Sequence, residues 1–374
     1  MPESFQSKEP VLVLGAGLMG RLLALSLARS GHAVRIVDAG PADGSGSAAR
    51  VAAAMLAPLA ESAITEPSVV AMGRYSLQRW PDLIAGLARP VYFQRNGTLV
   101  VWHRQDAHEA QRFSGLLAQT CRALPGLPRP QSLDDRTLPE LEPALAHRFH
   151  QGLYLPDEGQ LDNRQLLQAL TDSLAALGVT VEWNRPLTLE QAQDIQAAQG
   201  GWVLDCRGLG ARGEWQAPAQ NLRGVRGEVA RIHAPDVTLQ RPTRLLHPRY
   251  PIYIAPKEDH LFVIGATEIE SDDMSPASVR STLELLSAAY AVHPGFGEGR
   301  ILELCTHCRP TLPDNLPAVH EVAPRVLQVN GLYRHGFMIS PALLDAVLEW
   351  MEQGSKALAD HLQLRFSTLA AAAA

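Results

Sequence analysis

The sequence predicts a mixed α/β fold, and the first forty residues carry that prediction. Residues 11–14 are a short unbroken apolar run, residues 33–37 are a second, mostly apolar run, and leucine and alanine recur at helical spacing over residues 21–29 between them. Unbroken apolar runs are typical of strands that are covered on both faces. A strand, a helix and a second strand in this order form a βαβ unit. The chain has 374 residues, of which 46% are hydrophobic, so it can bury a large core.

A glycine motif, GAGLMG, joins the first predicted strand to the helix. In such a motif Gly15 makes the tight turn, Gly17 lets the backbone approach a pyrophosphate, and Gly20 lets the helix pack closely on the strand. The second predicted strand ends at Asp38, which is placed to accept hydrogen bonds from a ribose hydroxyl. Ala39 offers no cation for a ribose 2′-phosphate. The unit therefore predicts a dinucleotide site and disfavours NADP.

The segment that follows bears on the choice between NAD and FAD. Residues 40–54 are mostly Gly, Ser and Ala. An NAD-binding domain usually continues with a helix and a third strand, whereas small side chains suit a segment that lies close to a bulky flat ring. An alanine-rich helix N-terminus is the plainer alternative. The residue types favour FAD over NAD.

Further along the chain, several blocks resemble one family in its own order. They are residues 47–61 (SAARVAAAMLAPLAE), 253–257 (YIAPK), 264–268 (IGATE), 308–317 (CRPTLPDNLP), 331–336 (GLYRHG) and 340–342 (SPA). Together with the glycine motif and Asp38, these blocks look like the FAD-dependent D-amino acid oxidase superfamily, and especially its glycine oxidase branch. The resemblance covers the chain from about residue 11 to residue 350. It departs at Thr311, Leu312 and Asn315, where glycines are more frequent, and at Glu268, where an apolar residue is frequent.

The resemblance implies an interleaved architecture. A Rossmann-like FAD-binding domain would be interleaved with an α+β substrate domain built on a mostly antiparallel sheet. The FAD-binding domain would comprise residues 1–75, 150–215 and 305–365. The substrate domain would comprise residues 76–149 and 216–304, and residues 366–374, which end in an alanine run, would be a disordered tail.

The resemblance also implies an activity. The chain would oxidise the C–N bond of a small amino acid or amine by hydride transfer to FAD, giving an imine that hydrolyses to an oxo acid and ammonia. Oxygen would be the acceptor and H2O2 a product. A dehydrogenase that passes electrons to another acceptor is an alternative, and so are an NAD-dependent dehydrogenase and a non-catalytic flavin-binding protein.

Four residues are candidates for substrate binding. An arginine holds a substrate carboxylate in fixed geometry through two parallel charge-assisted bonds. By resemblance, Arg309 and Arg334 occupy the arginine positions of two matched blocks, and Tyr253 would add a hydroxyl to the same carboxylate. Glu268 would either contact a cationic substrate group or be a solvated carboxylate. Because hydride transfer from a neutral amine needs no protein base, we assign no catalytic acid or base.

The glycine motif and the resemblance together indicate the residues that border the cofactor. They are Gly15, Gly17, Leu18, Met19, Gly20, Asp38, Ala39, Ala48, Ala49, Ala53, Ala54, Met55, Leu187, Gly208, Leu332, Tyr333, Arg334, His335, Gly336, Phe337 and Met338.

Composition excludes several other classes of protein. The net charge of −6 lacks the basic footprint of a nucleic-acid binder, so a small-molecule partner is expected. The apolar stretch over residues 11–28 contains Arg21 and is too short and broken to span a membrane. We expect a cytoplasmic protein, and the sequence leaves a homo-oligomer open.

Two groups of metal-binding residue types do not form a convincing site. Cys305 and Cys308 form a CxxC motif, but a zinc site would need a second ligand pair, and Arg309 follows where a redox motif would open a helix. We interpret them as core or strand residues. His147 and His150 lack a third ligand nearby, so we expect them at the surface and expect no metal site.

Overall fold

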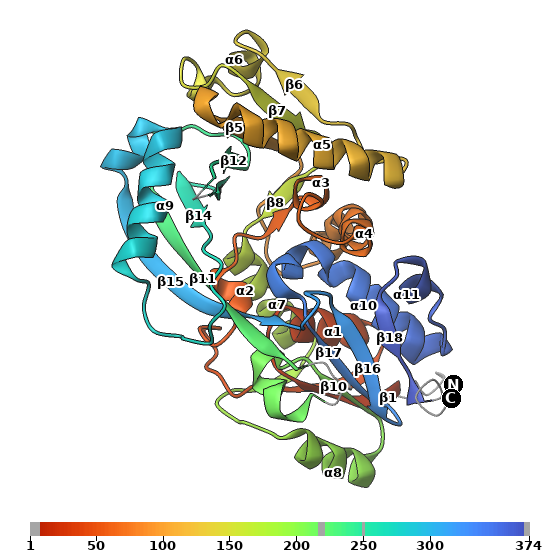
Figure 1. Cartoon of the computed structure of the whole chain (residues 1–374). Coiled ribbons are helices and arrows are strands. Elements are labelled where there is room, and N and C mark those ends of the chain that lie inside the picture. The colour runs from red at the N-terminus through yellow and green to blue at the C-terminus, as the bar shows by residue number, and fades with distance from the viewer. Residues whose placement is uncertain (1–7, 216–220, 249–250, 370–374) are drawn as a thin grey trace.

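The computed structural model describes residues 8–215, 221–248 and 251–369 of the chain. Two large sheets, one of seven strands and one of eight, occupy opposite halves of an elongated molecule (Figure 1). A small third sheet has the order β3-β8-β4 and is formed by β3 (Met55–Leu56), β8 (Gly159–Leu161) and β4 (Phe93–Gln94). This mixed α/β arrangement confirms the predicted fold class.

The seven-stranded sheet contains the predicted βαβ unit. Its order is β18-β16-β17-β10-β1-β2-β9, and every neighbouring pair is parallel except β16 and β17. The strands are β1 (Lys8–Leu14), β2 (His32–Val37), β9 (Thr180–Glu182), β10 (Trp202–Asp205), β16 (Ala318–Ala323), β17 (Val326–Asn330) and β18 (Arg365–Ser367). The predicted strands lie within β1 and β2, and the predicted helix lies within α1 (Leu18–Arg29).

Helices cover both faces of this sheet. On one face α1, α4 (Pro67–Ala85), α7 (Asn163–Ala176) and α10 (Gly336–Gln353) enclose the largest apolar core. On the other face α8 (Leu189–Gln199) packs on β1 and β10. Burial on both faces explains why β1 is an unbroken apolar run from residue 11 onward.

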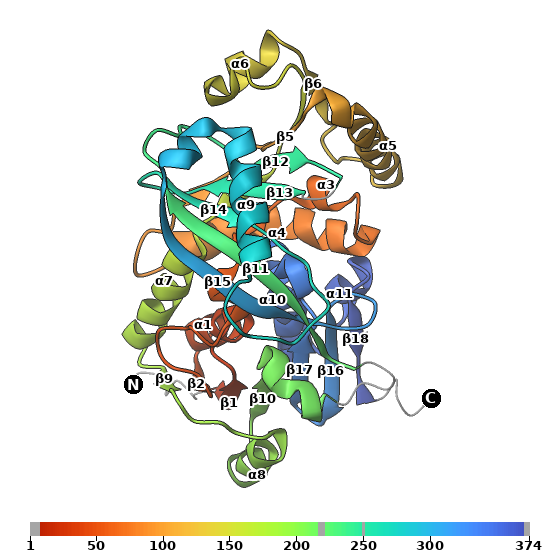
Figure 2. The same ribbon diagram turned by 60° about the vertical axis from the view of Figure 1, so that its left-hand side comes forward.

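The eight-stranded sheet is mostly antiparallel. Its order is β15-β11-β14-β13-β12-β5-β7-β6, and only β12 and β5 run parallel. The strands are β5 (Thr98–Trp102), β6 (Gln131–Leu133), β7 (Gly152–Leu155), β11 (Arg223–His233), β12 (Thr243–Leu246), β13 (Ile252–Pro256), β14 (Leu261–Gly265) and β15 (Arg300–Thr311). α9 (Val279–Val292) lies across β11, β13 and β14 (Figure 2) and closes a second apolar core.

The remaining helices are short or lie at the edges of the molecule. They are α2 (Ala48–Val51), α3 (Pro58–Glu61), α5 (Ala107–Ala123), α6 (Thr137–Leu141) and α11 (Ala357–His361), with 3-10 turns at Arg104–Asp106, Pro143–Leu145, Gly208–Glu214, Pro294–Glu298 and Tyr333–His335. Within the described ranges, no helix combines the length and apolar character that crossing a bilayer requires.

The expected boundaries differ from the observed elements in three places. The tail was expected to be disordered from residue 366, but Phe366 and Ser367 lie in β18, and Phe366 packs in the largest core. That prediction was wrong for these two residues, while residues 370–374 lie outside the described residues. The expected borders at 150 and 305 also do not follow the sheets, because β7 and the whole of β15 belong to the eight-stranded sheet.

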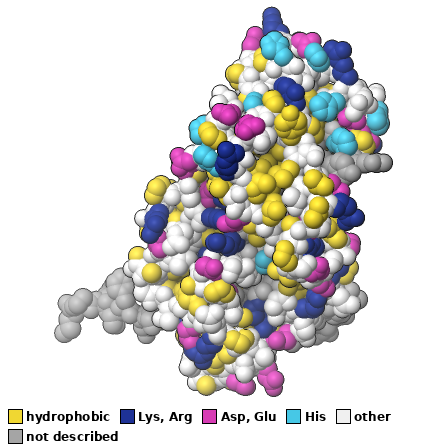
Figure 3. Space-filling view, turned by 90° about the vertical axis from the view of Figure 1, so that its left-hand side faces the viewer, with side chains coloured by type: hydrophobic (Ala, Val, Ile, Leu, Met, Phe, Trp, Pro, Cys, Tyr) yellow, Lys and Arg dark blue, Asp and Glu magenta, His cyan; other side chains and the backbone are white. Residues whose placement is uncertain are grey.

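Large apolar side chains are exposed mainly on α9 and β15. They are Val279, Leu283, Tyr290, Ile301, Leu302 and Leu304. Figure 3 looks at this side of the molecule, where hydrophobic side chains are interspersed with charged ones.

Candidate functional site

A pocket of about 920 Å³ is lined by residues from both large sheets and from the segments that follow their strands. The seven-stranded sheet contributes the residues that follow β1, β2 and β10, because the carboxyl ends of these parallel strands meet at one edge. The eight-stranded sheet contributes Tyr253 from β13 and Arg309 from β15. Crevices at the carboxyl edge of a parallel sheet are where α/β proteins bind nucleotides.

The glycine turn can accept only glycine at two of its positions. Gly15 has φ +93°, and a Cβ atom there would lie 2.7 Å from the carbonyl oxygen of Cys206. A Cβ atom on Gly20 would lie 1.8 Å from the carbonyl oxygen of Gly15, so α1 packs directly on the turn. Gly17 is the N-cap residue of α1, and no side chain caps this end of the helix. Its first N–H groups therefore face the pocket as a site for an anion.

Asp38 closes the nucleotide end of the pocket. Its two carboxylate oxygens accept hydrogen bonds from the backbone N–H groups of Ala16, at 2.5 Å, and Gly40, at 2.6 Å. These bonds hold the carboxylate against the glycine turn, where it lines the pocket. An acid in this position is suited to binding a ribose hydroxyl.

The small-residue segment is fixed from outside by two polar side chains. The Asn163 amide donates to the carbonyl oxygens of Ala49, at 2.8 Å, and Arg50, at 2.7 Å. The Lys257 ammonium group donates to the carbonyl oxygen of Ala53 at 2.9 Å, and also to Gln160 and Leu161. Burial lowers the pKa of Lys257 to about 7. The face of the segment that carries the alanine side chains of residues 48–54, the alanine face, is thus directed toward the pocket.

Arg309 lies in the part of the pocket formed by the eight-stranded sheet, and among the described residues no carboxylate pairs with it. Its guanidinium group donates to the carbonyl oxygens of Thr267, at 3.1 Å, and Arg226, at 3.4 Å. No ion pair of Arg309 occurs within the part of the chain that the structure describes. Gly227 makes room for this group, because a Cβ atom there would lie 2.4 Å from Nη2 of Arg309. Burial lowers the pKa of Arg309, which therefore carries a partly desolvated and uncompensated charge.

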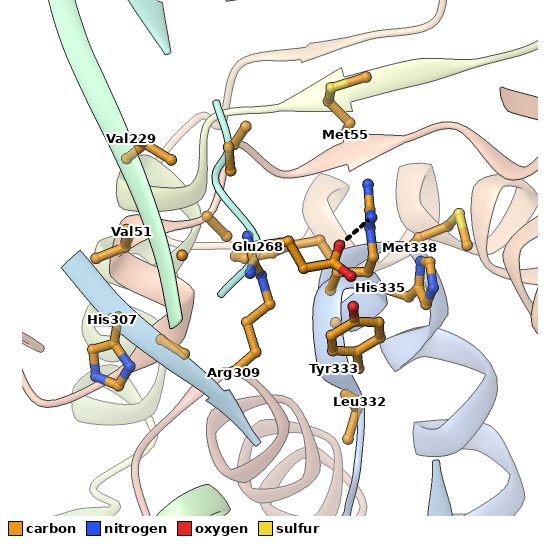
Figure 4. A pocket seen from close by; sticks show the side chains of 18 of the residues that line it. Val51, Met55, Val229, Glu268, His307, Arg309, Leu332, Tyr333, His335 and Met338 are labelled. Atoms are coloured by element: carbon orange, nitrogen blue, oxygen red, sulfur yellow. Dashed lines mark hydrogen bonds and ion pairs between the residues drawn. The ribbon is translucent and has the colours of Figure 1, made fainter. Parts of the chain in front are cut away.

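Arg334 differs, because carboxylates flank it on two sides. Its Nε atom lies 3.2 Å from Oε2 of Glu61, and its Nη1 atom lies 2.8 Å from Oε2 of Glu268. Burial acts to lower the pKa of Arg334, but the two carboxylates outweigh it and the pKa rises. Figure 4 shows Glu268, Arg309 and Tyr333 around the same space. The charge of Arg334 is thus already compensated.

Glu61 is the buried centre of this charged cluster. Its carboxylate forms ion pairs with Arg334 and with Arg244 of β12, and Nδ1 of His335 lies 3.6 Å from Oε2 of Glu61. Burial would raise the pKa of Glu61, but the two guanidinium groups hold it far below its usual range. Burial lowers the pKa of His335 to about 4, so its imidazole is neutral at pH 7.

Tyr253 lies beside Arg309 and Arg334. It pairs with Arg244 and Gly265 across the sheet, and a Cβ atom on Gly265 would lie 2.7 Å from the Tyr253 hydroxyl. Burial raises the pKa of Tyr253, although Arg309 and Arg334 oppose the rise. The hydroxyl therefore stays protonated and can donate a hydrogen bond.

Most of the predicted site residues come together in this pocket. Those that line it are Gly15, Gly17, Leu18, Met19, Asp38, Ala48, Ala49, Ala53, Ala54, Met55, Gly208, Tyr253, Glu268, Arg309, Leu332, Tyr333, Arg334, His335, Gly336, Phe337 and Met338.

Three predicted cofactor residues are not among the pocket lining. Gly20 lies beneath the glycine turn, and Ala39 follows Asp38. Leu187 packs beside the small core under α8, and its carbonyl oxygen accepts a hydrogen bond from Arg207 at 2.9 Å. The structure therefore does not bring Leu187 to the pocket.

Five residues that shape the site were not predicted from the sequence. They are Glu61, Asn163, Gly227, Arg244 and Lys257. Glu61 and Lys257 were inside matched blocks but had no assigned role. Gly227 had a local signal, since a glycine inside an apolar strand often marks a close approach.

The two cysteines of the CxxC motif lie in a strand and the two histidines lie at the surface, as predicted. Cys305 and Cys308 lie in β15 as free thiols, and burial raises the pKa of Cys308. His147 and His150 are exposed. Over the described ranges, no group of three or more His, Cys, Asp or Glu side chains could hold a metal ion.

Comparisons with known proteins agree with this geometry. Residues 10–350 match the family described as FAD dependent oxidoreductase. A protein of Rhizobium etli named as a thiamine biosynthesis oxidoreductase, ThiO, is 40% identical over 352 residues, which cover 92% of this chain and 97% of the relative.

Solved structures share the fold. The glycine oxidase of Geobacillus kaustophilus matches with a TM-score of 0.76 and 24% identity, covering 93% of this chain and 96% of that one. The glycine oxidase of Bacillus cereus also gives a TM-score of 0.76, at 20% identity, with 93% and 96% covered. At these identities the likeness concerns the fold.

Proposed function

The chain belongs to the family of FAD-dependent oxidoreductases, and we propose that its substrate is a small amino acid, with glycine the first candidate. It is a glycine oxidase-like enzyme that acts on the C–N bond of an amino acid or amine. One observation supports an amino acid as the substrate rather than an amine without a carboxylate. Arg309, an arginine without a carboxylate partner, lies beside a protonated tyrosine in the same pocket as the glycine turn.

The residues of the nucleotide end fit FAD. The uncapped start of α1 would bind the pyrophosphate, and Asp38 would bind the ribose. The alanine face fixed by Asn163 and Lys257 leaves room for a flat ring system beside Met55. A pocket of about 920 Å³ is within the size range of cofactor sites. Bound FAD would supply the acceptor for the hydride, which carries both electrons of the oxidation.

The protein itself contributes orientation and electrostatics. Arg309 and Tyr253 would hold the substrate carboxylate by charge-assisted hydrogen bonds, which fixes the direction of the α-carbon. Desolvation of Arg309 strengthens its attraction for that carboxylate. A neutral substrate amine can lose the α-hydrogen as hydride without a protein base. Loss of hydride leaves an iminium ion, which releases a proton to water and becomes the imine. The imine takes up water and gives the oxo acid and ammonia.

The proposal also covers the pathway that the reaction serves and the acceptor of the electrons. The relative from Rhizobium etli is named for thiamine biosynthesis, and we extend that role to this chain. We propose oxygen as the acceptor, which would give H2O2, and a dehydrogenase using another acceptor as the alternative. The cytoplasmic location and a homo-oligomer stay predictions.

An anaerobic screen tests the proposed function. The FAD-loaded protein is mixed without oxygen with glycine, sarcosine, D-alanine and a simple amine, and the loss of oxidised-flavin absorbance is followed. We expect reduction by the amino acids and little by the amine that lacks a carboxylate. Peroxide should appear in proportion to ammonia when air is admitted. A flavin that stays oxidised with every compound would contradict the proposed function.

A further inference from the structure

Glu268 is an acidic residue at the substrate end of the pocket, beside the unpaired arginine. It follows β14, and about half of its side chain is exposed. Its carboxylate accepts a hydrogen bond from Arg334 at 2.8 Å and another from the Tyr333 hydroxyl. These two donors hold the carboxylate in place, and Glu268 lines the same space as Arg309 (Figure 4). It is therefore a fixed negative charge that an incoming substrate meets.

Among the described residues around this space, the positive charges outnumber the negative charges by one. Three guanidinium groups, those of Arg244, Arg309 and Arg334, face two carboxylates, those of Glu61 and Glu268. Arg244 and Arg334 are both engaged in ion pairs, so the free charge is that of Arg309. A substrate with one carboxylate and a neutral amine balances it. A substrate with two carboxylates would bring a negative charge for which the described residues of this cluster offer no free cation.

We propose that Glu268 determines substrate specificity by rejecting amino acids that carry a second acidic group. This inference rests on the proposed function, because it takes the carboxylate bound at Arg309 as given. A second carboxylate would approach Glu268 in a partly desolvated space, where like charges repel strongly. It would also find Arg334 already hydrogen-bonded on both sides by Glu61 and Glu268.

The variant Glu268→Gln isolates the charge from the shape of the side chain. Glutamine keeps an oxygen that can accept the hydrogen bonds from Arg334 and Tyr333, but it removes the repulsion and leaves Arg334 only its ion pair with Glu61, which Glu61 shares with Arg244. Acetate and malonate are suitable probes because they carry one and two carboxylates and cannot be oxidised as amines. Their dissociation constants are measured from the change in flavin absorbance of the FAD-loaded protein.

We expect acetate to bind the wild type at least about tenfold more tightly than malonate, and Glu268→Gln to remove that difference by tightening malonate binding about tenfold or more. Acetate binding should change less than about threefold. Glu270→Gln is a matched control, because Glu270 lies two residues away, pairs with Arg223 and does not line the pocket. It should leave both constants unchanged.

Two results would overturn the proposal. One is that the wild type binds malonate as tightly as acetate, and the other is that Glu268→Gln changes the two constants by the same factor. Because the probes are not oxidised, this readout is separate from the anaerobic screen. A protein that discriminates acetate from malonate through Glu268 but is reduced by no amino acid would contradict the proposed function and leave the role of Glu268 in place.

Discussion

Replacing Arg309 by leucine should remove the anchor of the substrate carboxylate while leaving the cofactor bound. Among the described residues, the Arg309 guanidinium makes hydrogen bonds only to the carbonyl oxygens of Thr267 and Arg226, so its charge is free for a ligand. A hydrogen bond to a charged group contributes about 1.5–3 kcal/mol. At about 1.4 kcal/mol per factor of ten, the loss corresponds to roughly 10- to 150-fold weaker binding.

The assay has two readouts and two comparison variants. The dissociation constant of acetate and kcat/KM for glycine should both worsen by that factor, while the flavin-to-protein ratio stays that of the wild type. Arg309→Lys keeps the charge but loses the planar fork, so it should fall between the wild type and Arg309→Leu. Arg223→Leu removes an arginine of β11 that does not line the pocket, and it should have no effect on either readout. Unchanged acetate binding in Arg309→Leu with FAD retained would refute the reasoning.

Three further predictions follow from other contacts. Gly227→Ala should push the Arg309 guanidinium out of place, because the new Cβ would lie 2.4 Å from it, and we expect kcat/KM for glycine to fall about 100-fold with FAD retained. A wild-type value of kcat/KM would contradict this. Gly20→Val should separate α1 from the turn at Gly15 and cost about 1–3 kcal/mol of stability, with loss of FAD measured by the flavin-to-protein ratio. Full flavin content in a protein of unchanged melting temperature would count against it. Burial raises the pKa of Glu158 to about 7, so the folded chain binds this proton more tightly than the unfolded chain and loses stability as the pH rises from about 4.5 to 7. Glu158→Gln should remove that loss and be more stable than the wild type by roughly 3 kcal/mol at pH 8, with little gain at pH 4, as measured by thermal unfolding; an equal difference at both values would argue against it.

The nucleotide half of the site could be predicted because its signals are local. Gly15, Gly17 and Gly20 are required by a single turn and the helix that follows it, and Asp38 ends the next strand. The spacing of these residues is set by the length of one βαβ unit, which is why a short window of sequence contains the whole pattern. Arg309 and Tyr253 had no such local pattern and were indicated only by the family resemblance.

The contacts that the sequence did not reveal join distant parts of the chain. Glu61 and Arg244 are 183 residues apart, and Lys257 and Ala53 are 204 apart. No periodicity indicates such a pair, because Glu61 lies in α3 and Ala53 precedes β3, whereas Arg244 lies in β12 and Lys257 follows β13, and only the tertiary packing brings them together. The boundary at residue 366 failed for a related reason, since the alanine-rich composition nearby hid the packing of Phe366 in the core.

A crystal structure of the FAD-loaded protein with acetate would test the central claim most directly. We expect the pyrophosphate at the start of α1, the flavin ring beside the alanine face that ends at Met55, and the acetate carboxylate on the Arg309 guanidinium with the Tyr253 hydroxyl next to it. Acetate bound elsewhere in the pocket, or a flavin ring remote from Arg309, would contradict it.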